Sequence, residues 1–241
     1  IYSLFGGRGE EIEPFMAAIE MIHTSSLVHD DLPAMDGDEY RRGKHTTWVA
    51  YGEDMAILAG DALMIYAFEV AAKAFAMTDQ PRNVGRAIEI LAAKTGIYGM
   101  IGGQTVDVEL TDRPVSREQL DFIYHLKTGA LLEASMMIGA VLAGADEKVQ
   151  KQVEQMASDI GMAFQIQDDI LDVEGDAQVI GKPVKSDEKN NKTTYVTLYG
   201  PEGAKEQVKE YSRRAVEILD HFQAKDEFLR QLIISLITRD R

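Results

Sequence analysis

Two clusters of aspartates are the residues best suited to chemistry in this chain. Each ends an apolar segment and precedes a loop with cations: Asp30, Asp31 and Asp36 in the first, and Asp168, Asp169 and Asp172 in the second. Carboxylates this close repel one another, and the C-terminal end of a helix is already the negative end of its dipole. Because neither cluster has a cysteine or a histidine pair, the oxygen ligands favour Mg²⁺ or Mn²⁺ over zinc or copper. Either cluster alone could be a surface turn, but two matched clusters with apolar flanks predict a metal site.

The loops that follow the clusters, residues 33–52 and 175–193, contain the cations that a metal-bound phosphate needs. These are Arg41 and Arg42 after the first cluster, and Lys182, Lys185, Lys189 and Lys192 after the second. Arginine binds phosphate through a bidentate fork and lysine acts as a point charge, although Lys185 and Lys189 better suit solvated loop positions. The chain has no Gly-rich phosphate loop, so a nucleotide is not expected. The pattern predicts a diphosphate with an apolar tail, its head bound by metal at the mouth of an apolar cavity.

The segments that position these clusters are predicted to be helices. Apolar residues recur every three or four positions, as at positions 12, 15, 19 and 22. The expected helices cover residues 11–31, 53–77, 82–109, 116–143, 146–174, 202–222 and 226–238. Ser116 with Gln119 predicts a capping box, and Asp146 is a predicted N-cap. Since no linker or repeat divides the chain, we expect one all-α domain over residues 1–241, a bundle of long helices packed side by side.

The composition disfavours several classes of function. The 241 residues include 25 Lys and Arg against 40 Asp and Glu, and the formal net charge of −15 disfavours binding to nucleic acid or to an anionic membrane. The absence of cysteine excludes disulfides, thiolate nucleophiles and Cys-bound metals, and it suits a cytoplasmic protein. Uncharged runs such as residues 134–145 are far shorter than the ~18 residues of a membrane span, so an integral membrane protein is not expected.

Several motifs together resemble those of the trans-isoprenyl diphosphate synthases, the farnesyl and geranylgeranyl diphosphate synthase family, in the bacterial form. Residues 29–36 (HDDLPAMD) are similar to the first aspartate-rich motif of the family, and residues 164–172 (FQIQDDILD) to the second. Residues 41–43, 102–104 and 127–129 match further family motifs in order, and residues 181–182 and 187–195 match its basic loop. The similarity covers essentially the whole chain.

This resemblance implies a single-domain all-α bundle of mostly antiparallel helices around a central apolar cavity. It also implies a prenyltransferase that joins isopentenyl diphosphate to dimethylallyl, geranyl or farnesyl diphosphate. The aspartates of both clusters would hold Mg²⁺, with three ions implied and Mn²⁺ as an alternative. The other implied ligands are Arg41, Lys127, Thr128, Gln165, Lys182 and Lys192 for the allylic diphosphate, and His23 and Arg42 for isopentenyl diphosphate. The implied catalytic residues are Asp30, Asp36, Lys127, Asp168 and Lys182, which would stabilise the leaving diphosphate as the allylic C–O bond ionises.

The resemblance also bears on product length and assembly. The family controls product length with residues four and five positions before the first aspartate, here Ser26 and Ser25. Two small side chains leave the cavity open, so we expect a C15–C20 product, with geranylgeranyl diphosphate favoured over farnesyl diphosphate. A homodimer is implied. The Gly-Gly-Lys-Arg motif of the family is absent, so we expect that an N-terminal segment is missing, and Lys185 replaces the usual glycine of the basic loop.

Three alternatives stay open at this point. A class I terpene cyclase shares the helical scaffold and the first cluster, but it generally replaces the second cluster with an Asn/Ser/Glu pattern. A non-catalytic subunit of a heteromeric prenyl synthase typically lacks one of the clusters. A helical Ca²⁺-binding module needs the twelve-residue EF-hand loop, whose pattern does not occur in the sequence.

Overall fold

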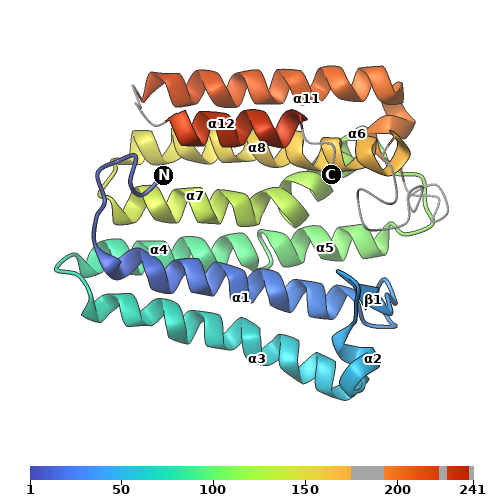
Figure 1. Ribbon diagram of the computed structural model, residues 1–241, viewed down its shortest axis with the longest axis horizontal. Coiled ribbons are helices and arrows are strands. Elements are labelled where there is room, and N and C mark those ends of the chain that lie inside the picture. Colours follow the sequence, from blue (N-terminus) through green and yellow to red (C-terminus); the bar gives the residue numbers. More distant parts are fainter. Residues whose placement is uncertain (175–192, 223–226, 239–241) are drawn as a thin grey trace.

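The computed structural model describes residues 1–174, 193–222 and 227–238 as a bundle of long helices laid side by side (Figure 1). The elements up to residue 95 are η1 (Glu10–Ile12), α1 (Glu13–Asp30), β1 (Tyr40–Arg41), β2 (Lys44–His45), α2 (Thr47–Tyr51), α3 (Glu53–Ala72), η2 (Lys73–Ala76) and α4 (Pro81–Thr95). The later elements are α5 (Met100–Glu109), α6 (Arg117–Ile123), η3 (Tyr124–Gly129), α7 (Ala130–Leu142), α8 (Glu147–Glu174), α11 (Tyr195–His221) and α12 (Glu227–Thr238). The predicted all-α class is confirmed.

The core lies between layers of helices rather than at one centre. α1 packs along α3, α7 packs between α4 and α8, and α8 packs along α11. Phe15 and Ile22 of α1 are fully buried with Leu91 of α4 and Ile138 of α7 in one apolar cluster. Removing such side chains from water is the main force that holds helices of this length together, because an isolated helix is marginally stable.

Two predicted helices are interrupted in the structure. The helix expected over residues 82–109 is divided into α4 and α5 at residues 96–99, where a Cβ on Gly99 would overlap the carbonyl oxygen of Lys94. The helix expected over residues 116–143 contains a six-residue π-helical turn, η3, between α6 and α7. At both interruptions the backbone packs closely against another backbone segment. Apolar periodicity does not reveal such close packing.

The helix ends agree with the predicted caps. Ser116 and Gln119 form the predicted capping box, and Asp146 accepts a hydrogen bond of 2.8 Å from the amide of Val149. α11 begins at residue 195, earlier than the predicted residue 202, because Thr194 caps a first turn before a kink at Gly200, whose φ is +72°.

A short hairpin follows the first aspartate cluster, where the sequence predicts only a polar loop. Tyr40 pairs with His45 and Arg41 pairs with Lys44 in an antiparallel ladder. Arg42 and Gly43 between them have φ of 52° and 76°. Positive φ at both central residues is typical of a type I′ turn, whose twist matches that of paired strands. The hairpin was not predicted, because an Arg-Gly turn lacks the usual Asn-Gly or Asp-Gly signal.

α3 with η2 (Glu53–Ala76) has a large exposed apolar surface. By length and composition this segment is apolar enough to cross a membrane, and only 22% of its most apolar window is buried. Leu58 and Ile65 are 60% and 71% exposed. Such composition also fits a helix of a water-soluble protein that packs against another protein surface.

Candidate active site

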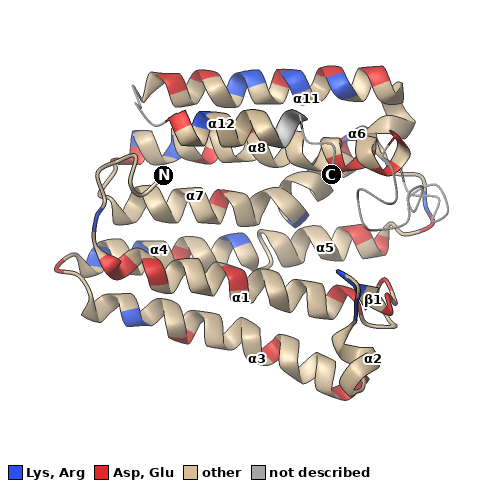
Figure 2. Cartoon of the chain, viewed as in Figure 1, with Lys and Arg blue, Asp and Glu red and all other residues tan. Residues whose placement is uncertain are grey.

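The first aspartate cluster lies where α1 ends, at the end of the bundle that also carries β1. Figure 2 shows acidic residues gathered where α1, α5 and α8 end. Pro33 follows the end of α1, and the amide of Asp36 donates to the carbonyl oxygen of Asp30 at 2.9 Å, so the chain folds back toward the helix end. Burial raises the pKa of Asp30, the charge of Lys127 opposes this, and the charge of Asp36 adds to it. Gln104 of α5 donates to the Asp30 carboxylate at 2.9 Å.

Asp31, the neighbour of Asp30, has a different environment. It is 4% exposed and accepts a bidentate pair of hydrogen bonds from Arg41, with Nη2 2.6 Å from Oδ1 and Nε 3.0 Å from Oδ2. A guanidinium that binds one carboxylate through two nitrogens is fixed in its plane as well as in its position. Asp31 therefore holds Arg41 at the site, while Arg42 lies exposed in the left-handed turn of the hairpin.

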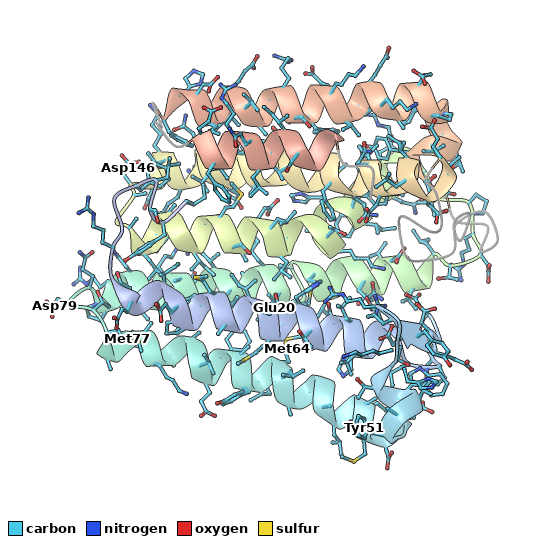
Figure 3. All side chains as sticks on the ribbon, viewed as in Figure 1. Glu20, Tyr51, Met64, Met77, Asp79 and Asp146 are labelled. Atoms are coloured by element: carbon cyan, nitrogen blue, oxygen red, sulfur yellow. The ribbon has the colours of Figure 1, made fainter. Side chains whose placement is uncertain are left out.

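An apolar cavity of about 660 Å³ opens beside Asp30. Its apolar walls come from α1, α3, α5 and α7 and include Leu27, Met64, Met100, Ile101, Val108 and Leu131. Figure 3 shows Met64 on the side of α3 that faces α1. His23, Ser26 and Asp30 line the cavity from one stripe of α1, so His23 shares a face with Asp30. The volume and the apolar walls are typical of a pocket for a small organic molecule.

Ser25 does not line this cavity, in contrast to Ser26. It is fully buried, and its hydroxyl donates to the carbonyl oxygen of Ile22 at 2.9 Å. Consecutive residues of a helix point about 100° apart, so only one of the two serines faces the cavity. Of the two positions expected to limit product length, the structure brings only Ser26 to the apolar wall.

Lys127 and Thr128 project from η3 toward two different helices. The Lys127 ammonium donates to Asp107 of α5 at 2.6 Å, and the Thr128 hydroxyl donates to Gln165 of α8 at 2.8 Å. Burial lowers the pKa of Lys127, but the charge of Asp107 and its hydrogen bond outweigh burial and raise the pKa, so this ammonium stays protonated. Charged and hydroxyl donors at a cavity mouth are suited to phosphate oxygens.

The second aspartate cluster lies at the end of α8, across η3 from the first. Asp169 is 3% exposed and accepts hydrogen bonds from the Tyr124 hydroxyl at 2.7 Å and from the amide of Tyr195 at 3.0 Å. Asp172 is 4% exposed, whereas Asp168 is partly exposed. A smaller cavity of about 130 Å³ reaches Asp169, and Lys127 and Thr128 line both cavities. η3 therefore joins the two clusters. The predicted ligands Lys182 and Lys192 lie outside the described residues.

The family model for polyprenyl synthetases matches residues 2–233. The chain belongs to the polyprenyl synthetase family. It is 47% identical to the farnesyl diphosphate synthase of Geobacillus stearothermophilus over 195 residues. These residues cover 81% of this chain and 66% of that enzyme. It is 44% identical to the geranylgeranyl diphosphate synthase of Cyanophora paradoxa over 228 residues. These residues cover 92% of this chain and 74% of that enzyme.

Solved structures of this family have the same fold. The crystal structure of a FPP/GFPP synthase from Zymomonas mobilis matches with a TM-score of 0.86 at 33% identity, over 98% of this chain and 79% of that one. A geranyltransferase from Helicobacter pylori, crystallised with magnesium and isoprenyl diphosphate, matches with a TM-score of 0.82 at 35% identity, over 94% and 74%. The chain thus spans from about two thirds to about four fifths of the length of these relatives.

The donor set of this polyprenyl synthetase fits a hard divalent cation. Within residues 1–174, 193–222 and 227–238, no group of three His, Asp or Glu side chains is placed to hold a metal ion alone. Mg²⁺ usually takes one or two carboxylates and completes its shell with water and substrate phosphate, so Asp30, Asp36 and Asp168 suit that mode. The buried Gln104 Oε1, beside Asp30, has no hydrogen-bond partner among the described groups, and a metal-bound water would satisfy it.

Several residues of this site were assigned no role from the sequence, although Gln104 lies in one of the matched motifs. Gln104 and Asp107 of α5 contact Asp30 and Lys127, and Tyr124 holds Asp169. Gln104 and Asp107 are three residues apart on a predicted helix, so the signal for one shared face was present. No comparable signal existed for Tyr124, whose hydroxyl reaches an aspartate 45 residues away in the sequence.

Proposed function

We propose that this protein is an Mg²⁺-dependent short-chain prenyltransferase that condenses isopentenyl diphosphate with an allylic diphosphate. One observation carries the proposal: Asp30, Lys127 and Thr128 stand together on the wall of a 660 Å³ apolar cavity. That arrangement suits a substrate with a charged diphosphate head and an apolar tail. Farnesyl and geranylgeranyl diphosphate synthases among the relatives support the same substrate class, and a relative crystallised with magnesium and isoprenyl diphosphate supports the metal.

The residues of the chain have distinct tasks in this reaction. Asp30, Asp36 and Asp168 would hold Mg²⁺, which when bound neutralises charge on the diphosphate. Arg41, Lys127, Thr128 and Gln165 bind that diphosphate and stabilise the charge that it gains as the allylic C–O bond breaks. Lys182 and Lys192 are assigned the same task from the sequence. Asp31, Asp169 and Asp172 are the buried members of the clusters, and Asp31 acts by holding Arg41.

The second substrate completes the reaction at the cavity mouth. His23 and Arg42 would bind isopentenyl diphosphate, whose double bond attacks the allylic carbocation to form the new C–C bond. A proton then leaves the adjacent carbon, with the departing diphosphate as its acceptor. The apolar walls keep water away from the carbocation, which water would otherwise quench. No protein nucleophile is required.

We infer a C15–C20 product, with C20 favoured. Ser26 is the small residue on the cavity wall one helical turn before Asp30, and it leaves space for a longer tail. We also infer a homodimer, because the exposed apolar side chains of α3 suit a second copy of the chain. Leu58 and Ile65 on α3, with Ile97 and Tyr98 before α5, are 60–79% exposed.

The test is a product assay with the purified protein, Mg²⁺, radiolabelled isopentenyl diphosphate and dimethylallyl, geranyl or farnesyl diphosphate. Elongated prenyl diphosphate is the expected product. Cyclic hydrocarbon would indicate a terpene cyclase instead, and turnover that requires a second protein would indicate a non-catalytic subunit. Asp30→Asn should abolish turnover, whereas Asp79→Asn, an exposed aspartate at the opposite end of the bundle (Figure 3), should not.

A further inference from the structure

The π-helical turn η3 is the element that presents Lys127 and Thr128, and π-helical turns are rare and often found at functional sites. A π-helical turn holds one residue more than an α-helical turn. Reverting it would rotate the preceding residues by about 100° relative to α7. Lys127 then could not reach Asp107 on α5 while Thr128 reaches Gln165 on α8, as they do here. The π form is therefore required for both donors to serve one site.

Two glycines clamp the backbone of η3 between neighbouring helices. A Cβ on Gly103 of α5 would overlap the backbone nitrogen of Lys127. A Cβ on Gly161 of α8 would lie 2.8 Å from the Cα of Gly129. Because no side chain separates the turn from α5 or α8, its backbone has little freedom to shift sideways.

A charge cluster, made of the fully buried Glu133 and the partly exposed Lys94, His125 and Glu154, lies against the same turn. Glu133 of α7 is fully buried and pairs with Lys94 of α4, whose ammonium also donates to Glu154 of α8 at 2.6 Å. His125 of η3 forms a hydrogen bond of 3.1 Å with the Ser158 hydroxyl of α8, and its Nδ1 lies 3.2 Å from Glu133 Oε1, an oxygen that has no hydrogen-bond partner among the described groups. The cluster thus ties α4, α7 and α8 to η3, two residues before Lys127.

Such a cluster is not needed for stability alone. Desolvating charged groups is costly, and apolar side chains of similar volume often stabilise a core as well or better. The hydrogen bonds that Lys94 donates to Glu133 and Glu154 accept only a narrow range of geometry, so they fix the position of the Glu133 carboxylate beside η3. Phosphate-binding groups need that precision, since a shift of about 1 Å can cost roughly a hundredfold in rate.

We propose that Glu133, held by Lys94 and in contact with His125, is a positioning residue that keeps η3 in the π form so that Lys127 and Thr128 face one diphosphate. The inference rests on the proposed function for the identity of the ligand. The geometry of the turn itself does not depend on that function.

The experiment compares Glu133→Gln with Asp159→Asn. Asp159 is a matched control: it is 1% exposed and paired with Arg214 of α11, so its carboxylate faces α11 and not η3. Hydrogen exchange without ligand should become roughly tenfold faster or more in the peptide that spans η3 in Glu133→Gln, and should stay unchanged there in Asp159→Asn. Calorimetry with inorganic pyrophosphate and Mg²⁺ should show affinity weakened by roughly tenfold or more in Glu133→Gln alone.

Equal exchange of η3 and equal pyrophosphate affinity in the two variants would overturn the inference. If the unmodified protein binds no pyrophosphate with Mg²⁺, the proposed function fails, while the exchange comparison still decides whether Glu133 anchors the turn. His125→Ala serves as a second variant if Glu133→Gln does not fold, because His125 is half-exposed and its removal breaks the same contact.

Discussion

The ammonium of Lys127 lies 2.6 Å from the carboxylate of Asp107, between the two aspartate clusters. The two residues come from different helices, η3 and α5, and each is only partly exposed, with 28% of each side chain accessible. The carboxylate keeps the lysine charged and holds it over the mouth of the apolar cavity. The aspartates make this site strongly negative, which disfavours a bound anion. A lysine that stays charged offsets part of that negative charge and so favours a diphosphate.

Replacing Lys127 by Gln should weaken use of the allylic diphosphate at least about tenfold in kcat/KM, because a charge-assisted hydrogen bond contributes roughly 1.5–3 kcal/mol. Steady-state kinetics with dimethylallyl diphosphate measures the loss. Lys209→Gln makes the same chemical change at an exposed position of α11 and should leave the kinetics unchanged. Equal kinetics in the two variants would remove Lys127 from the diphosphate site.

Replacing Ser26 by Tyr should shorten the main product, because the ring would occupy the cavity one turn before Asp30. Chromatography of the dephosphorylated products reports the chain length. Ser25→Tyr is the matched variant: Ser25 is fully buried, so its ring should lower the melting temperature through overpacking, at a cost of about 1–3 kcal/mol. A shorter product from Ser25→Tyr with an unchanged melting temperature would contradict the assignment of Ser26 to the cavity wall and Ser25 to the packed core.

Replacing Gly103 by Ala should reduce both turnover and stability, because its Cβ would overlap the backbone of Lys127. Gly85→Ala adds the same methyl group in α4, where no atom lies within 4 Å of the new Cβ. This control should be neutral or slightly stabilising, since alanine is favoured over glycine in a helix by about 1 kcal/mol. Circular dichroism melting and turnover of the two variants, compared side by side, provide the check.

Replacing Tyr124 by Phe should destabilise the protein by about 1–3 kcal/mol, because the buried Asp169 carboxylate loses a donor at 2.7 Å. Urea unfolding measures the change. Tyr98→Phe removes a hydroxyl from a side chain that is 79% exposed and should change the unfolding free energy by less than about 0.5 kcal/mol. Similar losses in both variants would argue against a structural role for the Tyr124 hydroxyl.

The stability that Lys94 provides should persist well into alkaline solution. Burial lowers the pKa of Lys94, but hydrogen bonds to Glu133 and Glu154 outweigh burial, so the folded-state pKa is raised. A raised lysine pKa means that the stabilisation is complete below the unfolded value of about 10.4 and is lost as pH rises through the higher folded value. The difference in unfolding free energy between the unmodified protein and Lys94→Met should therefore be constant from about pH 7 to 10 and shrink above that. If this difference in unfolding free energy already decreased near pH 8, the pairing of Lys94 with Glu133 and Glu154 would be contradicted.

Features set by short spacings were predictable from the sequence. The all-α class follows from apolar periodicity, and the shared face of His23 and Asp30 follows from seven-residue spacing. The return of Asp36 to Asp30 follows from the proline that ends α1. These features depend on residues within two turns of one another.

Features set by contacts between distant segments were not predictable in this way. Asp30 and Asp31 differ in environment because the hairpin brings Arg41 back to Asp31. The pair of Lys127 with Asp107 depends on how η3 crosses α5, and the backbone of the π-helical turn packs directly against Gly103 and Gly161 in other helices. Apolar periodicity reports which face of a helix is buried, and not which helix covers it.

Ser26 and Asp30 lie one turn apart on the same rigid helix, about 6 Å along its axis. In the proposed reaction, a larger side chain at the first position would leave less space for the hydrocarbon tail, while the second would stay beside the leaving diphosphate. Descendants of such an enzyme can thus diverge in what they make through single substitutions, and inherit unaltered the means by which the carbon–oxygen bond is broken.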